Sequence, residues 1–552
     1  MKDRQRSISY AAIESSLFFG AALLSALLFL LFRVPYLIRT GLYGAGLLAA
    51  PLYLYMASLL ISACLLPACV ARLVAMRMER KHPADAVRLT RTLGLYITAG
   101  GAVLTVFFWF LGPVFSRLCG NPFGSFSLRA AGPALWIMGY TGLLRGYYLG
   151  RGNSMLAALS VVLEQIFSGL ASLFLNGFFE EYGRKADLLY GASSYTAAYS
   201  AAGAVLSFAA GALLTLLVLQ LLASASGGGM QEANEGRRLE RLDSIHRSLE
   251  RVLLPVLLGA GLVLFGPFMD LLVIGPRLSE LYGAEEAVRF LGAFGTALLC
   301  FFVPVLAAGG IFAGLLPVLR YASSVRDRKL LSARMYLSAK FAAVFAVFCC
   351  ALLAVVHEPL SNLLFSGEDT VLLRHLLLYG TPFLFFAVMA LQKCAALCGL
   401  GYFTDPLKNA VWTFLAHLLL LVVLVYAVKL EMLGVLLANL LSAALFWILN
   451  TANLTLRFRR RQGLWQTYLL PVLCAVPAFL VPFLLLRLCA AVLPEAVQTG
   501  RPASGLLLLL CSLLIFWVYG AALSLSGALR RGELREMPLG HALERLLRRF
   551  MR

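Results

Sequence analysis

The sequence predicts an all-α polytopic membrane protein. Of its 552 residues, 61% are hydrophobic and only 13% are charged, and the mean hydropathy is +0.85. A soluble protein carries about 25% charged residues. Apolar runs of about 20 residues, long enough to cross a hydrocarbon core of about 30 Å, recur from one end of the chain to the other. These observations argue against a soluble fold and leave no segment for a soluble domain.

The apolar runs predict about fourteen membrane-spanning helices. The first run is longer than the apolar core of a secretory signal, so we interpret it as a retained helix. In order, the predicted helices are 9–34, 42–74, 87–116, 127–149, 154–180, 190–223, 247–275, 286–318, 334–365, 370–400, 405–428, 431–456, 464–493 and 503–529.

A weak repeat predicts two six-helix lobes, residues 1–223 and 247–461. Gly150-Arg151-Gly152 joins the fourth and fifth helices, and Gly399-Leu400-Gly401 joins the tenth and eleventh. Because each lobe has an even number of helices, the repeats would be parallel. The domain prediction is completed by a cytoplasmic linker at 224–246, two extra helices at 462–529, and a basic amphipathic tail at 530–552 that would lie on the membrane surface.

The distribution of lysine and arginine along the chain predicts how the protein is oriented in the membrane. These residues concentrate in the segments that a cytoplasmic N-terminus would place inside, which predicts that both termini are cytoplasmic. This bias accounts for the net charge of +20 without a nucleic-acid partner, and it suits anionic phospholipids. The eleven cysteines lie mostly in apolar runs and predict buried thiols rather than a metal site.

Several charged residues lie within or beside the apolar runs. A charge there costs about 2.5–3.5 kcal/mol on insertion scales, so it usually faces a partner or a watery cavity. Five of them are candidate substrate-binding residues, and two acids are candidates for ion coupling or conformational switching. The bases are Arg33, Arg39, Arg145, Arg289 and Lys393, and the acids are Asp270 and Glu164.

Each candidate also has a purely structural interpretation. Arg33, Arg39 and Lys393 would reach the membrane interface, Arg289 would be a solvated helix start, and Asp270 would cap the outer end of its helix. Arg145 and Glu164 would simply pair with each other. His417 is alone in its apolar run, which favours the interpretation that it is a packed residue rather than a functional one.

Four stretches carry a resemblance to a known family. They are Phe32-Arg33-Val34-Pro35 through Pro51-Leu52-Tyr53, then Arg145-Gly146-Tyr147-Tyr148 with Leu163-Glu164-Gln165, then the segment from Met269-Asp270 to Arg277-Leu278, and Leu316-Pro317-Val318. In their order and spacing the chain resembles the polysaccharide-flippase branch of the MOP (multidrug/oligosaccharidyl-lipid/polysaccharide) exporter superfamily. It is most similar there to stage V sporulation protein B and the lipid II flippases. It departs from the family at Ser25-Ala26, where a basic residue often follows the serine, and at Phe29, where a glycine is usual.

The resemblance implies a monomeric transporter of a bacterial plasma membrane, with two lobes around a cavity that opens alternately to each side. Its cargo would be an undecaprenyl-pyrophosphate-linked saccharide, and peptidoglycan lipid II is the leading candidate for that cargo. The last two helices would form a groove for the isoprenoid tail. Arginine suits a pyrophosphate because it stays charged and its fork matches pairs of phosphate oxygens. No cofactor is expected beyond a coupling H+ or Na+.

Two other classes remain open. A cation-coupled multidrug exporter of the MATE type would favour a carboxylate-lined, less basic cavity than these arginines suggest. A membrane enzyme would usually need acids or histidines on a sizeable outer domain, and the outer loops here are short. The sequence has no Gly-x-x-x-x-Gly-Lys-Ser/Thr pattern for a nucleotide, so we expect a transporter driven by a gradient or by the membrane potential.

Overall fold

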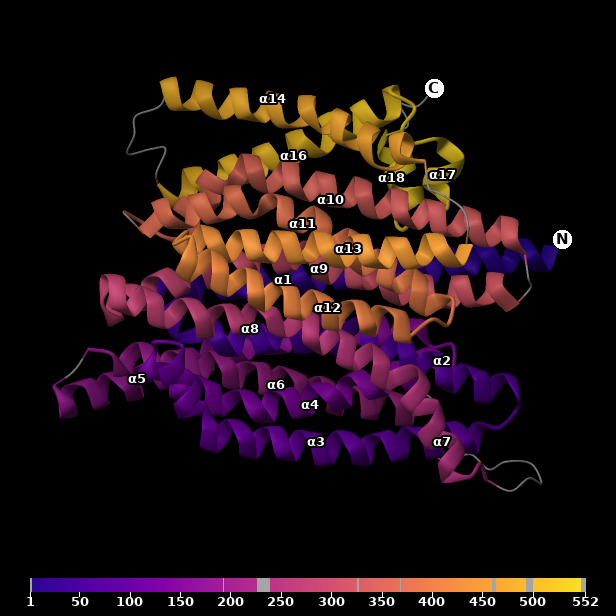
Figure 1. Ribbon diagram of the computed structural model, residues 1–552, viewed down its shortest axis with the longest axis horizontal. Coiled ribbons are helices and arrows are strands. Elements are labelled where there is room, and N and C mark those ends of the chain that lie inside the picture. The colour runs from indigo at the N-terminus through magenta and orange to yellow at the C-terminus, as the bar shows by residue number, and fades with distance from the viewer. Residues whose placement is uncertain are drawn as a thin grey trace. The chain divides into compact units, whose positions relative to one another are not determined.

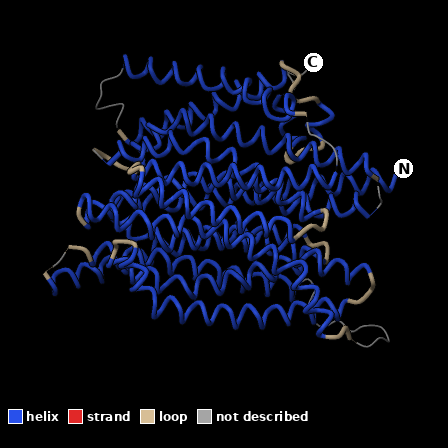
Figure 2. The backbone as a smooth tube through the Cα atoms, viewed as in Figure 1, coloured by secondary structure: helices blue, strands red, loops and turns tan. Residues whose placement is uncertain are grey.

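The structure, a computed structural model, describes residues 2–191, 193–225, 239–324, 327–367, 369–458, 463–492 and 500–547. It is 92% helical, and the described residues contain no strand (Figures 1 and 2). The fold class predicted from composition is confirmed. Most of the predicted linker, residues 226–238, and Phe550 of the predicted tail lie outside the described residues.

The helices of the first half of the chain include one very long run. They are α1 (Lys2–Leu60), η1 (Ile61–Leu65), α2 (Leu66–Glu79), α3 (Pro83–Leu118), η2 (Pro122–Gly124), α4 (Ser125–Gly150), α5 (Ser154–Tyr190), α6 (Tyr195–Ala225), α7 (Leu242–Ser248), η3 (Leu249–Leu253) and α8 (Leu254–Tyr282). Here η1 and η3 are π-helical turns and η2 is a 3-10 turn.

The second half follows the same pattern of long helices and short turns. Its elements are α9 (Ala284–Ser324), α10 (Arg328–Leu364), α11 (Asp369–Gly399), α12 (Thr404–Val422), η4 (Val423–Ala427), α13 (Glu431–Phe458), η5 (Trp465–Leu469), α14 (Leu470–Val492), α16 (Arg501–Leu525), α17 (Arg531–Arg535) and α18 (Gly540–Leu547). Both η4 and η5 are π-helical turns.

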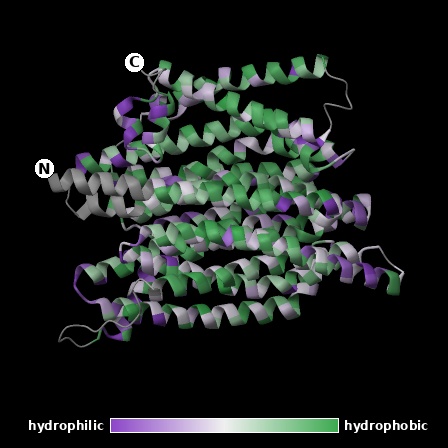
Figure 3. Cartoon of the chain, turned by 180° about the vertical axis from the view of Figure 1, so that it is seen from behind, coloured by the Kyte–Doolittle hydropathy of each residue, from purple (hydrophilic) through white to green (hydrophobic). Residues whose placement is uncertain are grey.

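Twelve helical runs among the described residues are long and apolar enough to cross a membrane. Hydrophobic residues cover most of the length of these helices, and hydrophilic residues gather near the helix ends (Figure 3). The chain is therefore a multi-pass membrane protein. The predicted number of fourteen is not confirmed. The run Ser16–Glu79 counts once although it contains the first two predicted helices, and α4 is not among the twelve.

The long first run bends where the sequence predicts a break between helices. Gly41 has φ 63° and ψ −164°, so α1 is two helices joined at a kink. A positive φ of this kind is costly for residues other than glycine. Pro35 lies just before the kink, and it removes a backbone hydrogen bond and crowds the carbonyl four residues earlier. The two residues make this half of α1 a natural bending point.

The chain divides into two compact units, which are described here separately. Unit 1 comprises Met1–Gly20, Ala297–Leu400 and Leu436–Arg552, and unit 2 comprises Ala21–Thr296 and Gly401–Val435. The domain boundaries 1–223 and 247–461 inferred from the repeat stay a prediction.

In unit 1 the C-terminal segment packs onto protein. Leu534 and Leu547 are buried, and Lys340 on α10 donates to Glu533 at 2.7 Å. The Leu539 amide donates to the Ser16 hydroxyl at 3.1 Å. A position on the membrane surface for the rest of this tail stays a prediction.

Candidate functional site

The turn between α4 and α5 brings two charged residues of unit 2 together. α4 ends at Gly150, Gly152 takes a φ of 87°, and the Asn153 side chain caps α5 by accepting from the Leu156 amide at 3.2 Å. Glycine tolerates the left-handed backbone and asparagine is a favoured N-cap, so the sequence itself specifies this tight reversal. The inward faces of α4 and α5 therefore meet.

Arg145 and Glu164 lie on these two faces and form a buried ion pair. Arg145 Nη2 donates to Glu164 Oε2 at 2.5 Å, and the two side chains are 1% and 0% exposed. Arg145 Nε also donates to the Ser160 hydroxyl at 2.8 Å, and Nη2 donates to the Ser160 carbonyl at 3.0 Å. The pairing that the sequence suggested for these two residues is present.

A third element, the π turn η1, completes the surroundings of Arg145. Arg145 Nη1 donates to the carbonyl of Ser62 at 3.3 Å. In a π turn each carbonyl accepts from the amide five residues later. For Ser62 that residue is Pro67, which has no N–H. The local sequence thus leaves a carbonyl free to accept from the guanidinium.

Arg33 occupies a second buried position in unit 2, and it differs from Arg145 because no acid in the described part of the chain neutralises it. The residue is 1% exposed. Nη2 donates to the Ser168 hydroxyl on α5 at 3.0 Å, and Nη1 donates to the Ser207 hydroxyl on α6 at 3.5 Å. Its guanidinium carbon lies 4.3 Å from the centroid of the Phe208 ring. Among the described residues no carboxylate lies within salt-bridge distance of Arg33, and its Nε has no hydrogen-bond partner.

Tyr55 connects the two buried arginines. Its ring stacks on Phe208 with centroids 3.7 Å apart, and its hydroxyl accepts from Gln165 Nε2 at 3.1 Å. Gln165 is the neighbour of Glu164 in α5. A continuous polar and aromatic column therefore runs inside unit 2 from Arg33 through Phe208 and Tyr55 to the Arg145–Glu164 pair, and we call it the Arg33–Arg145 column.

Asp270 lies outside this column and contacts His417. His417 Nε2 on α12 lies 3.1 Å from Asp270 Oδ1 on α8, and the two side chains are 5% and 0% exposed. Asp270 is therefore not an exposed cap at the outer end of its helix. His417 is packed as expected, but against a carboxylate. Among the described residues no group of three or more His, Cys, Asp or Glu side chains could hold a metal ion.

The remaining predicted residues lie elsewhere. Arg39 lines a cavity of about 20 Å³ in unit 2 together with Tyr36, Asn176 and Glu180, among others. Arg289, at the start of α9, pairs with Glu285 at 3.5 Å and Glu286 at 3.7 Å and is 41% exposed.

Lys393 is fully buried on α11 in unit 1, with its Nζ 5.9 Å from the centroid of Tyr468. The structure thus joins Arg33, Arg145 and Glu164 in one column and places the other four candidates outside it.

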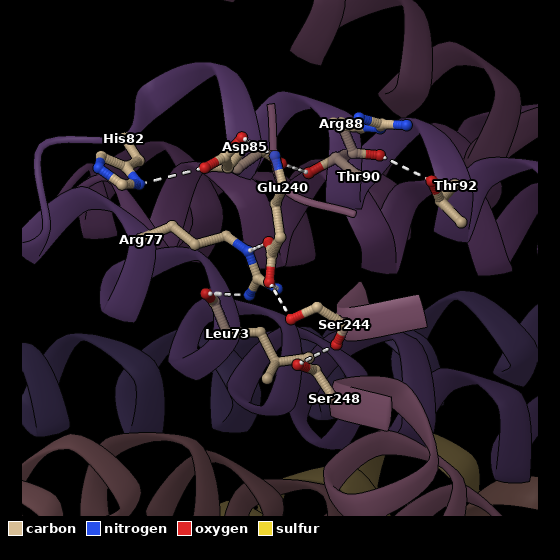
Figure 4. A network of polar contacts seen from close by, with 11 residues as sticks. Leu73, Arg77, His82, Asp85, Arg88, Thr90, Thr92, Glu240, Ser244 and Ser248 are labelled. Carbon is tan, nitrogen blue, oxygen red and sulfur yellow. Dashed lines mark hydrogen bonds and ion pairs between the residues drawn. The ribbon is translucent and has the colours of Figure 1, made fainter. Parts of the chain in front are cut away.

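A polar network ties the end of the predicted linker to the α2–α3 turn (Figure 4). Arg77 forms a bidentate pair with the Glu240 carboxylate, in which Nε donates at 2.8 Å and Nη2 donates at 3.1 Å. The Glu240 amide donates to Asp85 at 2.9 Å, and the Ser244 hydroxyl donates to the Glu240 carboxylate at 2.7 Å. No sequence pattern pointed to this network, because its two halves are far apart in the chain.

No family model matches this sequence. Among curated proteins, the chain is 24% identical over 392 residues to the uncharacterized membrane protein YabM of Bacillus subtilis (strain 168), covering 70% of this chain and 69% of that protein. Among solved structures, it resembles MATE in its straight conformation with a TM-score of 0.59 and 16% identity, over 82% of this chain and 97% of that one.

Two further structures agree. An inward-facing multidrug resistance MATE transporter of the MOP superfamily matches with a TM-score of 0.58 and 15% identity, over 82% of this chain and all of that one. The chain has the fold of the MATE transporters. A MOP superfamily transporter from Pyrococcus furiosus, described as having a binding pocket of reverse polarity that suggests a different function, matches with the same TM-score and 15% identity over 82% and 96% of the two chains. At these identities the likeness to the MATE structures establishes the two-lobed fold and leaves the cargo open.

Proposed function

We propose that this chain is a MOP superfamily transporter that moves an undecaprenyl-pyrophosphate-linked saccharide across a bacterial plasma membrane by alternating access. Peptidoglycan lipid II is the leading cargo, and the direction is from the inner to the outer leaflet. The observation that carries the proposal is the buried, acid-free guanidinium of Arg33 inside unit 2.

The electrostatics of the Arg33–Arg145 column favour an anionic cargo. Arg145 is neutralised by Glu164, whereas the contacts of Arg33 with the described residues are to hydroxyl and aromatic groups. A buried charge is costly unless it is paired, so an uncompensated arginine at such a position is usually kept for a ligand or for a conformational partner. Its fork and its free Nε suit the oxygens of a pyrophosphate.

Access to Arg33 requires movement, because the side chain is closed off in this conformation. Pro35 and the kink at Gly41 lie next to Arg33 on α1. Bending α1 there would separate Arg33 from Ser168 and Ser207 and open its guanidinium to a ligand. In this proposal, opening exchanges two hydroxyl contacts for phosphate contacts, so cargo binding would stabilise the open form.

The buried acids supply the coupling in this proposal. Asp270, with His417 beside it, is the first candidate for a group that changes its protonation or binds a cation during the cycle, and Glu164 is the second. The proposal includes Arg39, Arg289 and Lys393 as further cargo contacts. It also places both termini in the cytoplasm, takes a monomer as the working unit and assigns no catalytic residue, because the cargo leaves chemically unchanged.

A cation-coupled multidrug exporter is the second candidate. It is favoured by the fold likeness to a multidrug resistance MATE transporter and by two acids buried among membrane helices, which could attract a cationic drug or its counter-ion. The two candidates predict opposite cargo charges, which makes them easy to separate.

Transport by purified protein in proteoliposomes would test the proposal. We expect wild type to move fluorescent lipid II between leaflets and to leave it chemically intact. Replacing Arg33 with Gln should slow this movement about 10- to 100-fold, because charge-assisted hydrogen bonds contribute about 1.5–3 kcal/mol. Arg33→Lys should restore part of the rate by keeping the charge.

Arg129→Gln is a matched control. Arg129 lies on α4, away from the column, and its Nε donates to the carbonyl of Trp109 on α3. This variant should leave the rate unchanged. Thermal unfolding in detergent would show that each variant is folded. Transport of a cationic dye without any movement of lipid II would instead establish the multidrug exporter.

A further inference from the structure

A groove in unit 1 runs along one face of α13. It has a volume of about 470 Å³, and its lining is Trp447, Ile448, Thr451, Ala452, Thr455 and Leu456. These residues recur at the spacing that places side chains on one helical stripe. The lining is mostly apolar, and Ile448 and Leu456 are strongly exposed. A groove of this kind on a membrane-spanning helix is suited to an alkyl chain.

Aromatic rings from other helices pack beside Trp447. Its ring lies 5.6 Å from Phe386 on α11 and 5.9 Å from Tyr468 on η5, measured between centroids. Tyr468 lies within the π-helical turn η5 and is buried there. Single π turns inside α-helices are frequent at functional sites.

Two polar atoms on the groove residues have no partner. Trp447 Nε1 and Thr451 Oγ1 are both buried and make no hydrogen bond with the described residues. An unpaired buried donor costs about 1–3 kcal/mol in a folded protein. The Thr451 hydroxyl would be satisfied by a ligand that carries acceptor oxygens, which a plain hydrocarbon does not.

Positive charge lies at one end of the groove and beside Tyr468. Arg457 follows Leu456 in the last turn of α13 and is exposed. The buried Lys393 ammonium lies 5.9 Å from the centroid of Tyr468. At 1.5 Å per residue, Arg457 lies about 15 Å along the helix from Trp447. The groove therefore runs from a basic end near the membrane interface to an aromatic end deeper in the bilayer.

We propose that this groove binds an anionic phospholipid of the surrounding bilayer. Basic pockets between membrane helices are a common setting for anionic lipid headgroups. The phosphate would lie at Arg457 and the glycerol ester oxygens would reach the Thr451 hydroxyl. One acyl chain would follow Ile448 to Trp447. This site is distinct from the Arg33–Arg145 column, and the inference does not depend on which cargo the protein carries.

Quenching of tryptophan fluorescence tests the site without any cargo. The protein is reconstituted in phosphatidylcholine vesicles containing phosphatidylglycerol, with brominated acyl chains on one lipid or on the other. The difference between wild type and Trp447→Phe isolates the signal of Trp447. We expect brominated phosphatidylglycerol to quench that signal about twice as strongly as brominated phosphatidylcholine at the same mole fraction.

Variants that remove a positive charge test whether the preference for phosphatidylglycerol comes from the basic residues. Arg457→Gln and Lys393→Gln together should abolish the preference for phosphatidylglycerol, and the milder Thr451→Val should weaken it while keeping the fold. Arg487→Gln, on α14 beside Phe483, should keep it. Equal quenching by both lipids in wild type would mean ordinary boundary lipid, and no quenching by either would mean a groove closed to lipid. Either result would overturn the proposal.

Discussion

Arg145 and Glu164 meet across 2.5 Å with less than 2% of either side chain exposed, whereas Arg33 in the same unit pairs with no acid among the residues that the structure describes. The first arrangement neutralises its charges internally. The second leaves a positive charge that a phosphate could take. The sequence alone offered both arginines as cargo ligands of equal standing, and the structure distinguishes their surroundings.

Removing one partner of the Arg145–Glu164 pair should destabilise the protein strongly. Arg145→Met leaves a buried carboxylate without its base, which typically costs about 3–5 kcal/mol. The double variant Arg145→Met with Glu164→Leu should recover much of that loss, because no isolated charge remains. The free energy of unfolding in mixed micelles measures both. A double variant as unstable as the single one would show that the pair contributes through packing rather than charge.

Close backbone approach between α1 and α9 should make Gly292 intolerant of a methyl group. A Cβ on Gly292 would overlap the carbonyl oxygen of Leu42, and one on Gly46 would overlap the carbonyl oxygen of Val288. Gly292→Ala should therefore cost about 1–3 kcal/mol of stability. Gly261→Ala is the control, since nothing lies within 4 Å of its added methyl. It should stabilise α8 by about 0.5–1 kcal/mol, and equal effects at both sites would contradict the packing described here.

The network in Figure 4 should protect the end of the predicted linker and the start of α7 from proteolysis. Glu240→Gln keeps the shape but replaces the charged acceptor of the Arg77 fork. Because hydrogen bonds to charged groups contribute about 1.5–3 kcal/mol, we expect faster limited proteolysis between residues 239 and 248. Glu250→Gln, an exposed residue on η3, should leave the cleavage rate unchanged. Unaltered protection in Glu240→Gln would mean that the segment is held by other contacts.

Acid should loosen the C-terminal segment. Arg535 donates to Glu544 through two hydrogen bonds of 2.7 Å, and these hold the pKa of Glu544 below its ordinary value. A carboxyl with a lowered pKa stabilises the folded form above the unfolded pKa and loses that contribution as the pH falls through the lowered value. Proteolysis of residues 530–547 by an acid-active protease should therefore rise below about pH 4. Glu544→Gln should show a flatter pH dependence with the same protease, and raised cleavage at neutral pH with a protease that is active there.

The sequence predicted the helical fold, most helix positions and the Arg145–Glu164 pair because these depend on local signals. Gly152 and Asn153 specify the turn that brings α4 and α5 face to face. Gly41 lies in the predicted break between the first two helices. The surroundings of Arg33 depend instead on how α1 packs against α5 and α6, and no local pattern encodes that. The contact of His417 with Asp270 was missed for the same reason, as the two residues lie far apart in the chain.

Affinity for a short prenyl pyrophosphate is the most direct test of the central claim that Arg33 binds an anionic cargo. Geranyl pyrophosphate would be titrated into detergent-solubilised wild type, Arg33→Gln and Arg129→Gln. The account predicts saturable binding that weakens about 10- to 100-fold in Arg33→Gln and is unchanged in Arg129→Gln. Equal affinity in folded wild type and Arg33→Gln would contradict it.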